Sequence, residues 1–499
     1  MIATPRELGE SLPAGTVHSV LDISSLPVQE LVSKRLVSCS PNADLRAAAR
    51  AMVKNDVGSI VVLDDDGLVI GIITDGDLRR GVAAGFEGPV SGIMSAPVVT
   101  ITSGTLVIEA IHEMLRRGIH HMVVVDGRCP EGVISTSDLL SAHSESPLFV
   151  AREIDMAGSC SQLASVRSRI ELMVGSLIDR GVGAYDLGRI TAELNDRLVR
   201  KIIGLLEADI SSRGIGSPPV PFCWLGLGSE GRREQTVKSD QDNALIYRDP
   251  PEEQSREAQA YFQHLASRVV EELVSCGFPP CNGGVMASNL RWCQPLSVWK
   301  QYFSTWVRES EPTNLLNATI FFDFRPIMGD VSLAEELQEH LHQEIAARKA
   351  FISLLAKTAL SHRPPLGFFR NLVVERTGEH RGAVDLKHRG LLPLMEAVRV
   401  YSLNHALRIS NTFERVGALE EKGVFSHDEA TDIAEAYEFI MLLRIRRQID
   451  QIRKTQPPDN FVNPDKLSRA ERNQLKGYFG VISNLQSCLE SHFLTWFVA

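Results

Sequence analysis

A repeat of about sixty residues in the first third of the chain constrains the fold more than any other feature. In the first copy, residues 59–64 (SIVVLD) lead through a polar turn to residues 71–78 (GIITDGDL). In the second, residues 121–126 (HMVVVD) lead through another turn to residues 132–139 (GVISTSDL). The offset is 62 residues before the turn and 61 after it. One supersecondary unit, two apolar strands followed by the start of a helix, is therefore used twice.

Each copy also carries signals for helices. Apolar residues at helical spacing predict amphipathic helices over residues 45–54 and 107–117, ahead of the two strands. After the second strand, a hydroxyl residue lies three positions before an aspartate, where it can cap the next helix. These pairs are Thr74 with Asp77 in the first copy and Ser135 with Asp138 in the second.

This pattern resembles a tandem pair of CBS domains, a Bateman module, over residues 31–145, divided at about 31–85 and 90–145 and preceded by a leader of residues 1–30. The resemblance implies that an adenine nucleotide binds as a regulatory ligand, through Thr74, Asp77, Ser135 and Asp138. A carboxylate can accept both ribose hydroxyls, and a helix N-terminus favours phosphate. The alternative is that both aspartates only stabilise the first turn of a helix. The resemblance also implies a homodimer formed through the CBS domains.

A second feature lies in residues 225–247, LGLGSEGRREQTVKSDQDNALIY. An apolar strand ends at Gly228-Ser229, and Asp240 and Asp242 precede another apolar run. Residues two apart in a strand share a face, so the two carboxylates would repel each other unless a cation, such as a divalent metal ion, lies between them. A Gly-Ser turn lets backbone N–H groups and a hydroxyl approach phosphate oxygens.

A third carboxylate is needed to complete a two-metal site and to activate an acceptor hydroxyl. Residues 318–325 (ATIFFDFR) read as a strand, and Asp323 lies inside it between two phenylalanines. A carboxylate there is costly to bury unless it is coordinated or paired. Asp323 is therefore the preferred third ligand, with Arg325 as its partner or as a phosphate ligand. Asp330, in a turn, is the weaker alternative.

These residues resemble the nucleotidyltransferase superfamily that shares its fold with DNA polymerase β, although Gln241 replaces the usual hydrophobic residue between the aspartates. The longer string GSEGRREQTVKSDQDNALI resembles nucleotidyltransferase-like proteins that carry CBS or cyclic-nucleotide-binding domains in front. Protein-PII uridylyltransferases and glutamine-synthetase adenylyltransferases are their characterised relatives. Two tail segments, DLKHRGLLPLMEAVRVYSLNHALRISNT and LRIRRQID, resemble the helical substrate-binding domain of that family.

The resemblance implies an α/β multidomain chain. A helical connector (146–217) follows the CBS module, then a polymerase β-like α/β core (218–331) and an α-helical C-terminal domain (332–499). The implied reaction is Mg²⁺-dependent transfer of a nucleoside monophosphate from a nucleoside triphosphate to an acceptor hydroxyl, on a signalling protein as in the protein-PII uridylyltransferases. Asp240, Asp242 and Asp323 would hold two Mg²⁺ ions, Gly228 and Ser229 would cradle phosphate, and Arg232 and Lys238 would neutralise it.

Other charged and aromatic groups have two interpretations. A group of charges in the tail forms either a solvated surface or a basic groove that faces the active site. Its members are Asp385, Lys387, His388 and Arg389 at one helix start and Arg444, Arg446 and Arg447 on another helix. Three tryptophans spaced by seven residues (292, 299 and 306) favour a packing stripe on one helix over a base-stacking platform.

Composition limits the alternatives. The net charge of -10 disfavours a nucleic-acid-directed transferase, which would normally show a basic face. The eight cysteines form no CxxC pair, as expected of reduced thiols, and no segment resembles a signal peptide or a membrane span, so a cytoplasmic protein is expected. A non-catalytic, nucleotide-sensing scaffold remains the main alternative to an enzyme.

Overall fold

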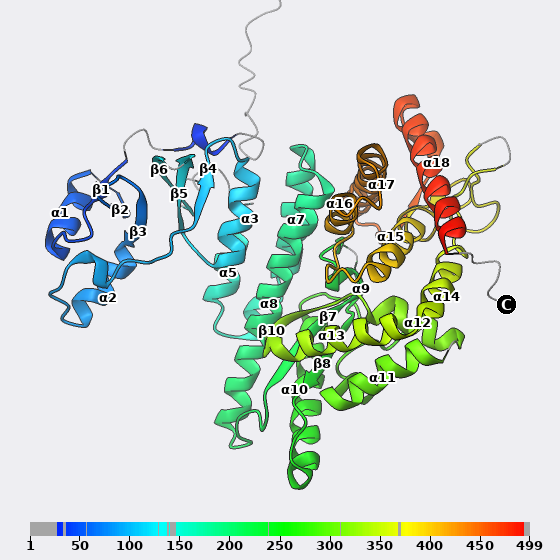
Figure 1. The fold of residues 1–499 in the computed structure, drawn as a ribbon, viewed down its shortest axis with the longest axis horizontal. Coiled ribbons are helices and arrows are strands. Elements are labelled where there is room, and N and C mark those ends of the chain that lie inside the picture. Colours follow the sequence, from blue (N-terminus) through cyan, green and yellow to red (C-terminus); the bar gives the residue numbers. More distant parts are fainter. Residues whose placement is uncertain are drawn as a thin grey trace, which may run out of the picture.

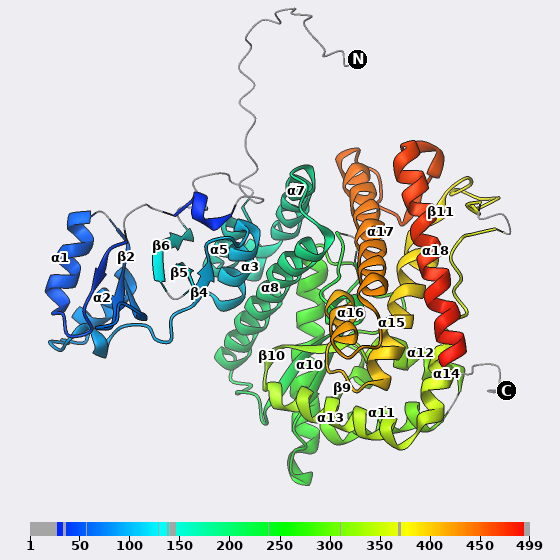
Figure 2. The ribbon, with the colours of Figure 1, turned by 45° about the horizontal axis from the view of Figure 1, so that its top comes forward.

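The computed structural model describes residues 27–32, 36–55, 57–127, 129–136, 139, 146–237, 239–309, 311–367 and 371–493. The CBS repeats lie at one end of the molecule, two long connector helices stand next to them, and the central sheet with its helices and the C-terminal helices lie beyond (Figures 1 and 2). Within the described part of the chain, no helix has both the length and the hydrophobicity that a membrane span requires.

The two repeats form matching three-stranded sheets, with a parallel pair followed by an antiparallel pair in each. The first contains β1 (Ser38–Cys39), α1 (Leu45–Asn55), β2 (Ser59–Leu63), β3 (Val69–Thr74) and α2 (Asp75–Ala83). The second contains β4 (Thr100–Thr102), α3 (Val107–Arg117), β5 (His121–Asp126) and β6 (Cys129–Ser135). A short 3-10 helix comes before the first strand of each repeat: η2 (Val28–Glu30) before β1 and η3 (Val90–Gly92) before β4. Val61 and Ile72 of one sheet pack against Val123 and Val125 of the other, as a duplicated unit predicts.

The connector consists of α5 (Pro147–Met156), α6 (Cys160–Leu163), α7 (Val166–Asp179) and α8 (Ala184–Ser212). Helix α8 is 29 residues long and contacts α3 and α5 on the CBS side. It also contacts α10, α17 and β10. It therefore joins the second repeat to the rest of the molecule.

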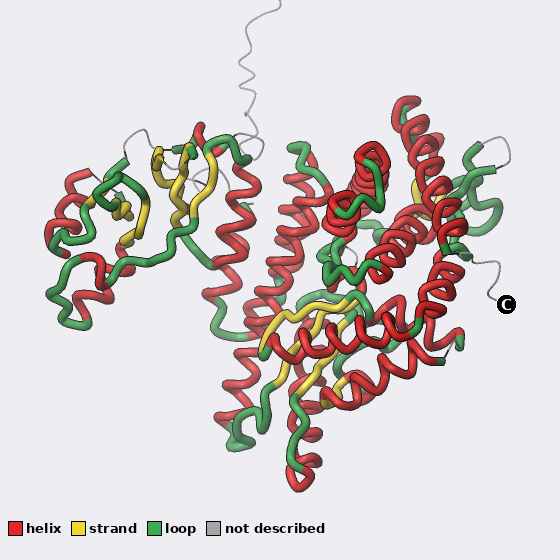
Figure 3. Tube along the Cα trace, viewed as in Figure 1, coloured by secondary structure: helices red, strands yellow, loops and turns green. Residues whose placement is uncertain are grey.

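The core is a four-stranded sheet in the order β10-β7-β8-β9, in which only β8 and β9 are parallel. Its strands are β7 (Phe222–Leu227), β8 (Asn243–Tyr247), β9 (Cys293–Pro295) and β10 (Phe324–Gly329). Its helices are α9 (Gly228–Gly231), η4 (Glu252–Gln254), α10 (Ser255–Ser275), η5 (Leu290–Trp292), α11 (Leu296–Arg308), α12 (Pro312–Phe321) and α13 (Val331–Ala347). Figure 3 shows helices packed around these strands.

The strand predicted over residues 318–325 is wrong in its first half. Helix α12 continues to Phe321, and β10 begins only at Phe324, so Asp323 lies at the junction. The aromatic residues there favour a strand by propensity, but tertiary packing overrides it. The ring of Phe321 packs 4.4 Å from that of Trp292 and 5.2 Å from that of Trp306. The tryptophans are buried packing residues as predicted, although Trp292 precedes the helix that carries the other two.

The C-terminal region is mostly helical, as predicted, and its helices lie together on the side of the core away from the CBS repeats (Figure 2). It contains α14 (Lys349–Ala359), η6 (Lys387–Leu391, a π-helix), α15 (Leu392–Asn404), α16 (Thr412–Glu421), α17 (His427–Arg453), η7 (Pro464–Lys466) and α18 (Arg469–His492). A two-stranded sheet pairs β11 (Val384–Asp385) with β12 (Phe461–Val462).

Candidate functional site

The Gly-Ser turn and the second aspartate meet at the end of β7. Gly228 has a φ of 53°, a left-handed conformation that glycine adopts without strain, and begins the short helix α9. The Leu227 N–H donates to the Asp242 carbonyl oxygen over 2.9 Å. A Cβ on residue 228 would lie 3.5 Å from Asp242 Oδ2. The structure therefore places the predicted phosphate cradle next to a predicted metal ligand.

Asp240 and Asp242 lie just before β8, both partly buried. Burial raises the pKa of Asp242, and the Asp240 carboxylate adds to this effect. Gln241 between them is buried, and its side-chain amide donates to the Phe278 carbonyl oxygen over 3.0 Å. Gln241, which replaces the usual hydrophobic residue, therefore has a hydrogen-bond partner that is not one of the two carboxylates. Two neighbouring, partly shielded carboxylates are a donor set that suits a divalent cation.

Three cationic side chains from distant elements interact electrostatically with this pair. They are Arg167 of α7, Lys387 of η6 and Arg444 of α17, and the Asp240 carboxylate favours the charged form of each. Burial lowers the pKa of all three, that of Arg444 to about 10. Among the described residues, neither aspartate makes an ion pair within 4.0 Å. The cations therefore face the carboxylates without being neutralised by them.

Local contacts hold these cations in place. Arg167 donates through Nη2 to the Val237 carbonyl oxygen over 2.5 Å, and its guanidinium lies 4.2 Å from the centre of the Phe278 ring. The Arg444 Nε group donates to Asn460 Oδ1 over 2.7 Å. Asp385 Oδ1 accepts from the Lys387 N–H over 2.9 Å, which fixes the start of the π-helix η6. π-helical turns occur often at functional sites. Of the two interpretations of the tail charges, the basic groove fits Lys387 and Arg444.

Asp323 does not join the aspartate pair. It is completely buried, with its carboxylate oxygens 2.6 Å from Arg415 Nη2, 2.9 Å from Arg232 Nη1 and 3.6 Å from Arg399 Nη1. Burial alone would raise the pKa of Asp323, but these guanidinium groups outweigh it and hold the pKa well below its usual range. A carboxylate paired in this way is a poor base and a poor metal ligand.

Two related expectations also change. Arg325 does not pair with Asp323, because both of its terminal nitrogens bind Asp196 of α8, at 2.5 and 2.7 Å. Across the described residues, no group of three or more His, Cys, Asp and Glu side chains is placed to hold a metal ion. The prediction of Asp323 as third ligand and base is therefore corrected: it is an internal counter-ion.

Arg232, predicted to bind phosphate, is also committed elsewhere. It is buried, and its guanidinium donates to Glu234 Oε2 over 2.7 Å and to Asp323 Oδ2 over 2.9 Å. Glu234 in turn accepts hydrogen bonds from the Thr412 N–H (2.6 Å) and the Tyr437 hydroxyl (2.7 Å). We call Arg232, Glu234, Asp323, Arg415 and Tyr437 the interdomain latch, because they tie the core to the C-terminal helices.

The comparisons with known proteins agree with this architecture. Residues 28–84 and 90–145 match the CBS domain, and residues 168–313 match the family described as "Putative nucleotidyltransferase DUF294". Residues 349–493 match the "Putative nucleotidyltransferase substrate binding domain" that accompanies it. The chain belongs to the CBS-containing DUF294 nucleotidyltransferases. The resemblance inferred from the sequence is thereby confirmed. The latch joins the two matched regions, with Arg232 and Glu234 in one and Arg415 and Tyr437 in the other.

Other relatives match mainly shorter stretches. An uncharacterized 17.7 kDa protein of Acidianus ambivalens is 30% identical over 118 residues, 23% of this chain and 71% of that protein. The inosine-5'-monophosphate dehydrogenase of Mycobacterium tuberculosis is 28% identical over 217 residues, 40% of this chain and only 38% of the enzyme. A CBS domain protein of Pyrobaculum aerophilum, solved with AMP, shows 28% identity and a TM-score of 0.23, covering 24% of this chain and 94% of that one.

In the first CBS repeat of this DUF294 protein, Thr74 and Asp77 cap the N-terminus of helix α2. The Thr74 N–H donates to Asp77 Oδ2 over 2.8 Å, and the Asp77 N–H donates to Thr74 Oγ1 over 3.4 Å. Arg80 Nη2 also lies 2.5 Å from the Asp77 carboxylate. In the second repeat Ser135 ends β6. Asp138, like Lys238 and residues 1–26 of the leader, lies outside the described residues.

The sequence interpretation missed two further groups near Asp242. Glu230, inside the GSEG segment, is buried, and burial raises its pKa to about 8, with Asp196 and Asp242 adding to the effect. The Cys281 thiol hydrogen bonds with Asp242. Glu230 could have been noticed within the motif. Neither Cys281 nor Arg167 is marked by any local pattern, because each reaches the site only through the tertiary fold.

Proposed function

We propose that this protein is a Mg²⁺-dependent nucleotidyltransferase that transfers a nucleoside monophosphate from a nucleoside triphosphate to an acceptor hydroxyl. One observation carries the proposal. The Gly228-Ser229 turn lies beside Asp242, and Arg167, Lys387 and Arg444 are close enough to the aspartate pair for the Asp240 carboxylate to favour their charged forms. A phosphate cradle, a divalent-cation donor set and nearby cations are what a triphosphate requires. Arg167 also pairs with Glu171 at 3.4 Å, so it would share its charge between that carboxylate and phosphate.

Each group has a specific role in this proposal. Asp240 and Asp242 would hold Mg²⁺, which, when bound, neutralises phosphate charge and orients the phosphates. The backbone N–H groups of the turn and the Ser229 hydroxyl bind phosphate oxygens. Arg167, Lys387 and Arg444 replace Arg232 as the side chains that offset the triphosphate charge. In the transfer, the acceptor oxygen bonds to the α-phosphorus as the bond to pyrophosphate breaks, and the hydroxyl proton passes to water, because Asp323 is paired with arginines.

The acceptor is proposed to be a signalling protein, as for the protein-PII uridylyltransferases. Support comes from the source of two cations, because Lys387 and Arg444 both belong to the C-terminal domain. That domain therefore forms one wall of the site and would present the acceptor. Regulation by an adenine nucleotide at the CBS repeats, a homodimer formed through them, and a cytoplasmic location complete the proposal.

Label transfer tests this function. Purified protein is incubated with Mg²⁺ and α-³²P-labelled ATP or UTP in a lysate of the source cells. A labelled band with wild type, lost in Asp240→Asn/Asp242→Asn and retained in Asp65→Asn, supports the proposal. Asp65 is an exposed aspartate in the first CBS repeat and serves as the matched control. Absence of both label and pyrophosphate release with every nucleotide contradicts it.

One observation favours a second candidate, a nucleotide-sensing scaffold without catalysis. Asp323 is fixed by three arginines and supplies no third acidic ligand. A site with only two acidic ligands could bind a nucleotide and Mg²⁺ without turnover. Saturable ATP or UTP binding that depends on Asp240 and Asp242, without pyrophosphate release, would identify this scaffold.

A further inference from the structure

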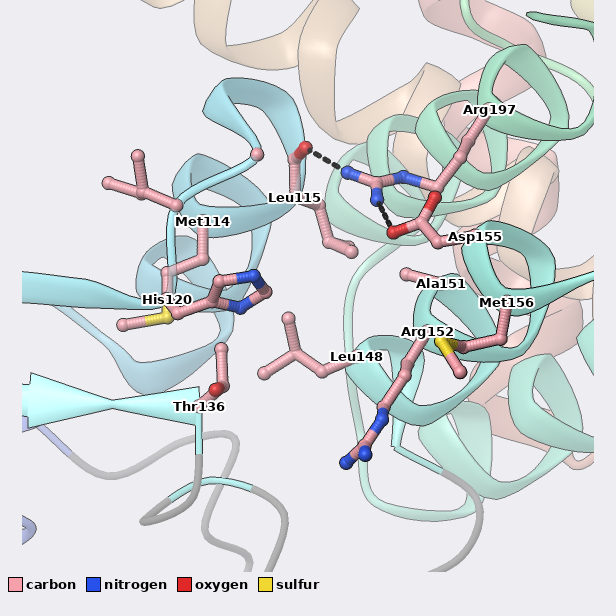
Figure 4. Close-up of a pocket in the computed structure, with 12 residues that line it drawn as sticks. Met114, Leu115, His120, Thr136, Leu148, Ala151, Arg152, Asp155, Met156 and Arg197 are labelled. Atoms are coloured by element: carbon pink, nitrogen blue, oxygen red, sulfur yellow. Dashed lines mark hydrogen bonds and ion pairs between the residues drawn. The ribbon is translucent and has the colours of Figure 1, made fainter. Parts of the chain in front are cut away.

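A pocket of about 380 Å³ lies where the second CBS repeat meets the connector (Figure 4). The end of α3, the segment 118–120 and Thr136 form one side, and α5 and Arg197 of α8 form the other. The pocket contains no residue of the proposed active site and neither Thr74 nor Asp77. Its volume is near the lower end of the range for small-molecule sites, about 300–1,000 Å³.

The sheet of the second repeat has two faces. One contacts the first repeat, and the pocket lies on the other. Alternate residues of β5 point to opposite faces. Val123 and Val125 pack against the first repeat, whereas Met122 and Val124 belong to the core shared with the connector. His120, two positions before Met122, lies on the connector side and lines the pocket.

The lining combines a guanidinium and an imidazole with an apolar wall, and the Asp155 carboxylate also lines it. Among the described residues, the side chains of His120 and Arg152 make no hydrogen bond or ion pair, and Figure 4 shows both at the pocket. Arg197, in contrast, is occupied by Asp155 at 2.5 Å and by the Leu115 carbonyl oxygen at 3.0 Å. Leu148 and Met156 supply apolar surface, and the Met156 side chain is 76% exposed.

We propose that this pocket binds a small organic phosphate. The phosphate is held by the Arg152 guanidinium, whose fork matches phosphate oxygens, with His120 and the Thr136 hydroxyl beside it. The apolar part of the ligand packs on Leu148 and Met156. Thr74, Asp77 and Ser135 are not among its lining residues, and two of its walls come from the connector.

Helix α8 connects this pocket to the Gly-Ser turn. Arg197 lines the pocket, and the adjacent Asp196 binds both terminal nitrogens of Arg325, whose Nε donates to the Glu230 carbonyl oxygen over 3.1 Å. One residue earlier, the Asn195 side-chain amide donates to Gln235 Oε1 over 2.8 Å. A ligand that fixes α5 against α3 therefore restrains α8 and, through it, residues 228–235. This coupling rests on the contacts and does not require the proposed transfer reaction.

Calorimetry with phenyl phosphate tests the site on the full chain. The probe joins a phosphate to an apolar ring, while inorganic phosphate and benzyl alcohol each provide one half. We expect saturable binding of phenyl phosphate, at least tenfold weaker binding of each half, and at least tenfold weaker probe binding in Arg152→Gln and His120→Ala. Arg46→Gln, an exposed arginine in the first repeat, should bind as wild type. Absent probe binding, or equal binding by Arg152→Gln, overturns the site.

Hydrogen exchange tests the coupling independently of catalysis. Saturation with phenyl phosphate should slow amide exchange at least threefold in residues 228–235 of wild type and leave Arg152→Gln unchanged. Binding without any change in these residues overturns the coupling. Because neither measurement uses a nucleoside triphosphate, failure of the proposed transferase would leave both results interpretable.

Discussion

Three aspartates that look alike in the sequence have different environments in the fold. Asp240 and Asp242 are partly exposed beside each other, while Asp323 is buried among arginines. A carboxylate next to another carboxylate needs a cation, whereas a carboxylate between guanidinium groups already has its counter-ions. Residue type and spacing alone do not distinguish a metal ligand from an internal counter-ion. Of the three arginines around Asp323, one is Arg232 in the motif, and the other two lie far along the chain in α15 and α16.

The difference predicts that the same substitution has a large effect on stability at one position and a small effect at the other. Asp323→Asn leaves buried guanidinium groups without a counter-ion and should lower the free energy of unfolding by about 3–5 kcal/mol. Asp240→Asn removes a like-charge neighbour of Asp242 and should change it by less than about 1 kcal/mol. Urea unfolding followed by circular dichroism measures both. Equal stability of the two variants would contradict the counter-ion role of Asp323.

A buried histidine predicts a pH effect at the contact between the CBS repeats and the connector. His112 of α3 is 3% exposed, and burial, followed by the charge of Arg189, lowers its pKa to about 4. The unfolded chain binds a proton near pH 6.5, but the folded protein does so only near pH 4. Stability contributed by neutral His112 is therefore complete above pH 6.5 and is lost as the pH falls toward 4, by up to about 3 kcal/mol.

Thermal unfolding between pH 7.5 and 4.5 tests this effect. The midpoint of the transition that includes the connector should fall more steeply with decreasing pH in wild type than in His112→Gln, which has no group to protonate. His427→Gln is the control, since that histidine is exposed on a helix start. Parallel pH profiles of wild type and His112→Gln would show that His112 does not cause the effect.

At the scale of elements, the sequence predicted what local patterns can encode. The duplicated strands, the Gly228-Ser229 turn and most helices follow from periodicity and turn residues. The segment before Asp323 was assigned wrongly, since its aromatic residues serve a helix that packs on Trp292 and Trp306. The cations of the site were predicted only as a possible groove, or not at all. They come from α7, η6 and α17, which only the tertiary fold brings together.

Helix α8 offers a controlled test of how an element positions the site. A Cβ at Gly188 would lie 2.8 Å from the Arg233 carbonyl oxygen, whereas a Cβ at Gly204 on the same helix would meet nothing within 4 Å. Through helix propensity alone, each Gly→Ala change should stabilise the helix by about 0.5–1 kcal/mol. Gly204→Ala should therefore raise the unfolding midpoint. Gly188→Ala should lower it, because overpacking costs about 1–3 kcal/mol.

The same pair of variants tests the functional role of this contact. Gly188→Ala displaces the turn that contains Arg233 and should weaken nucleotide binding at the proposed site, measured by calorimetry with ATP and Mg²⁺. Gly204→Ala should bind as wild type. Unchanged nucleotide binding in Gly188→Ala would mean that α8 supports the fold without positioning the Gly-Ser turn.

At the scale of the whole molecule, the second CBS repeat packs more extensively against the rest of the chain than against the first CBS repeat. Its helix α3 shares one continuous apolar core with the connector, the sheet of the transferase core and the C-terminal helices. The first repeat has a separate core around Ala48, Met52, Ile60 and Ile73. Among the described buried apolar residues, a small cluster that includes Val61 and Val123 joins the two repeats. A duplicated sequence has therefore become two units with different attachments.

This division predicts two steps in thermal unfolding. The first repeat should unfold in a small transition of its own, followed by a large transition of the rest, both measured by scanning calorimetry. Met52→Ala, at a side chain 2% exposed in the first core, should lower the first midpoint only. Leu194→Ala, at a completely buried side chain of α8, should lower the second only. Each truncation should cost about 2–5 kcal/mol in its own unit. If Met52→Ala lowered both midpoints together, the first repeat would be coupled to the rest of the chain through the small cluster around Val61 and Val123, and a signal could reach the proposed site from either repeat.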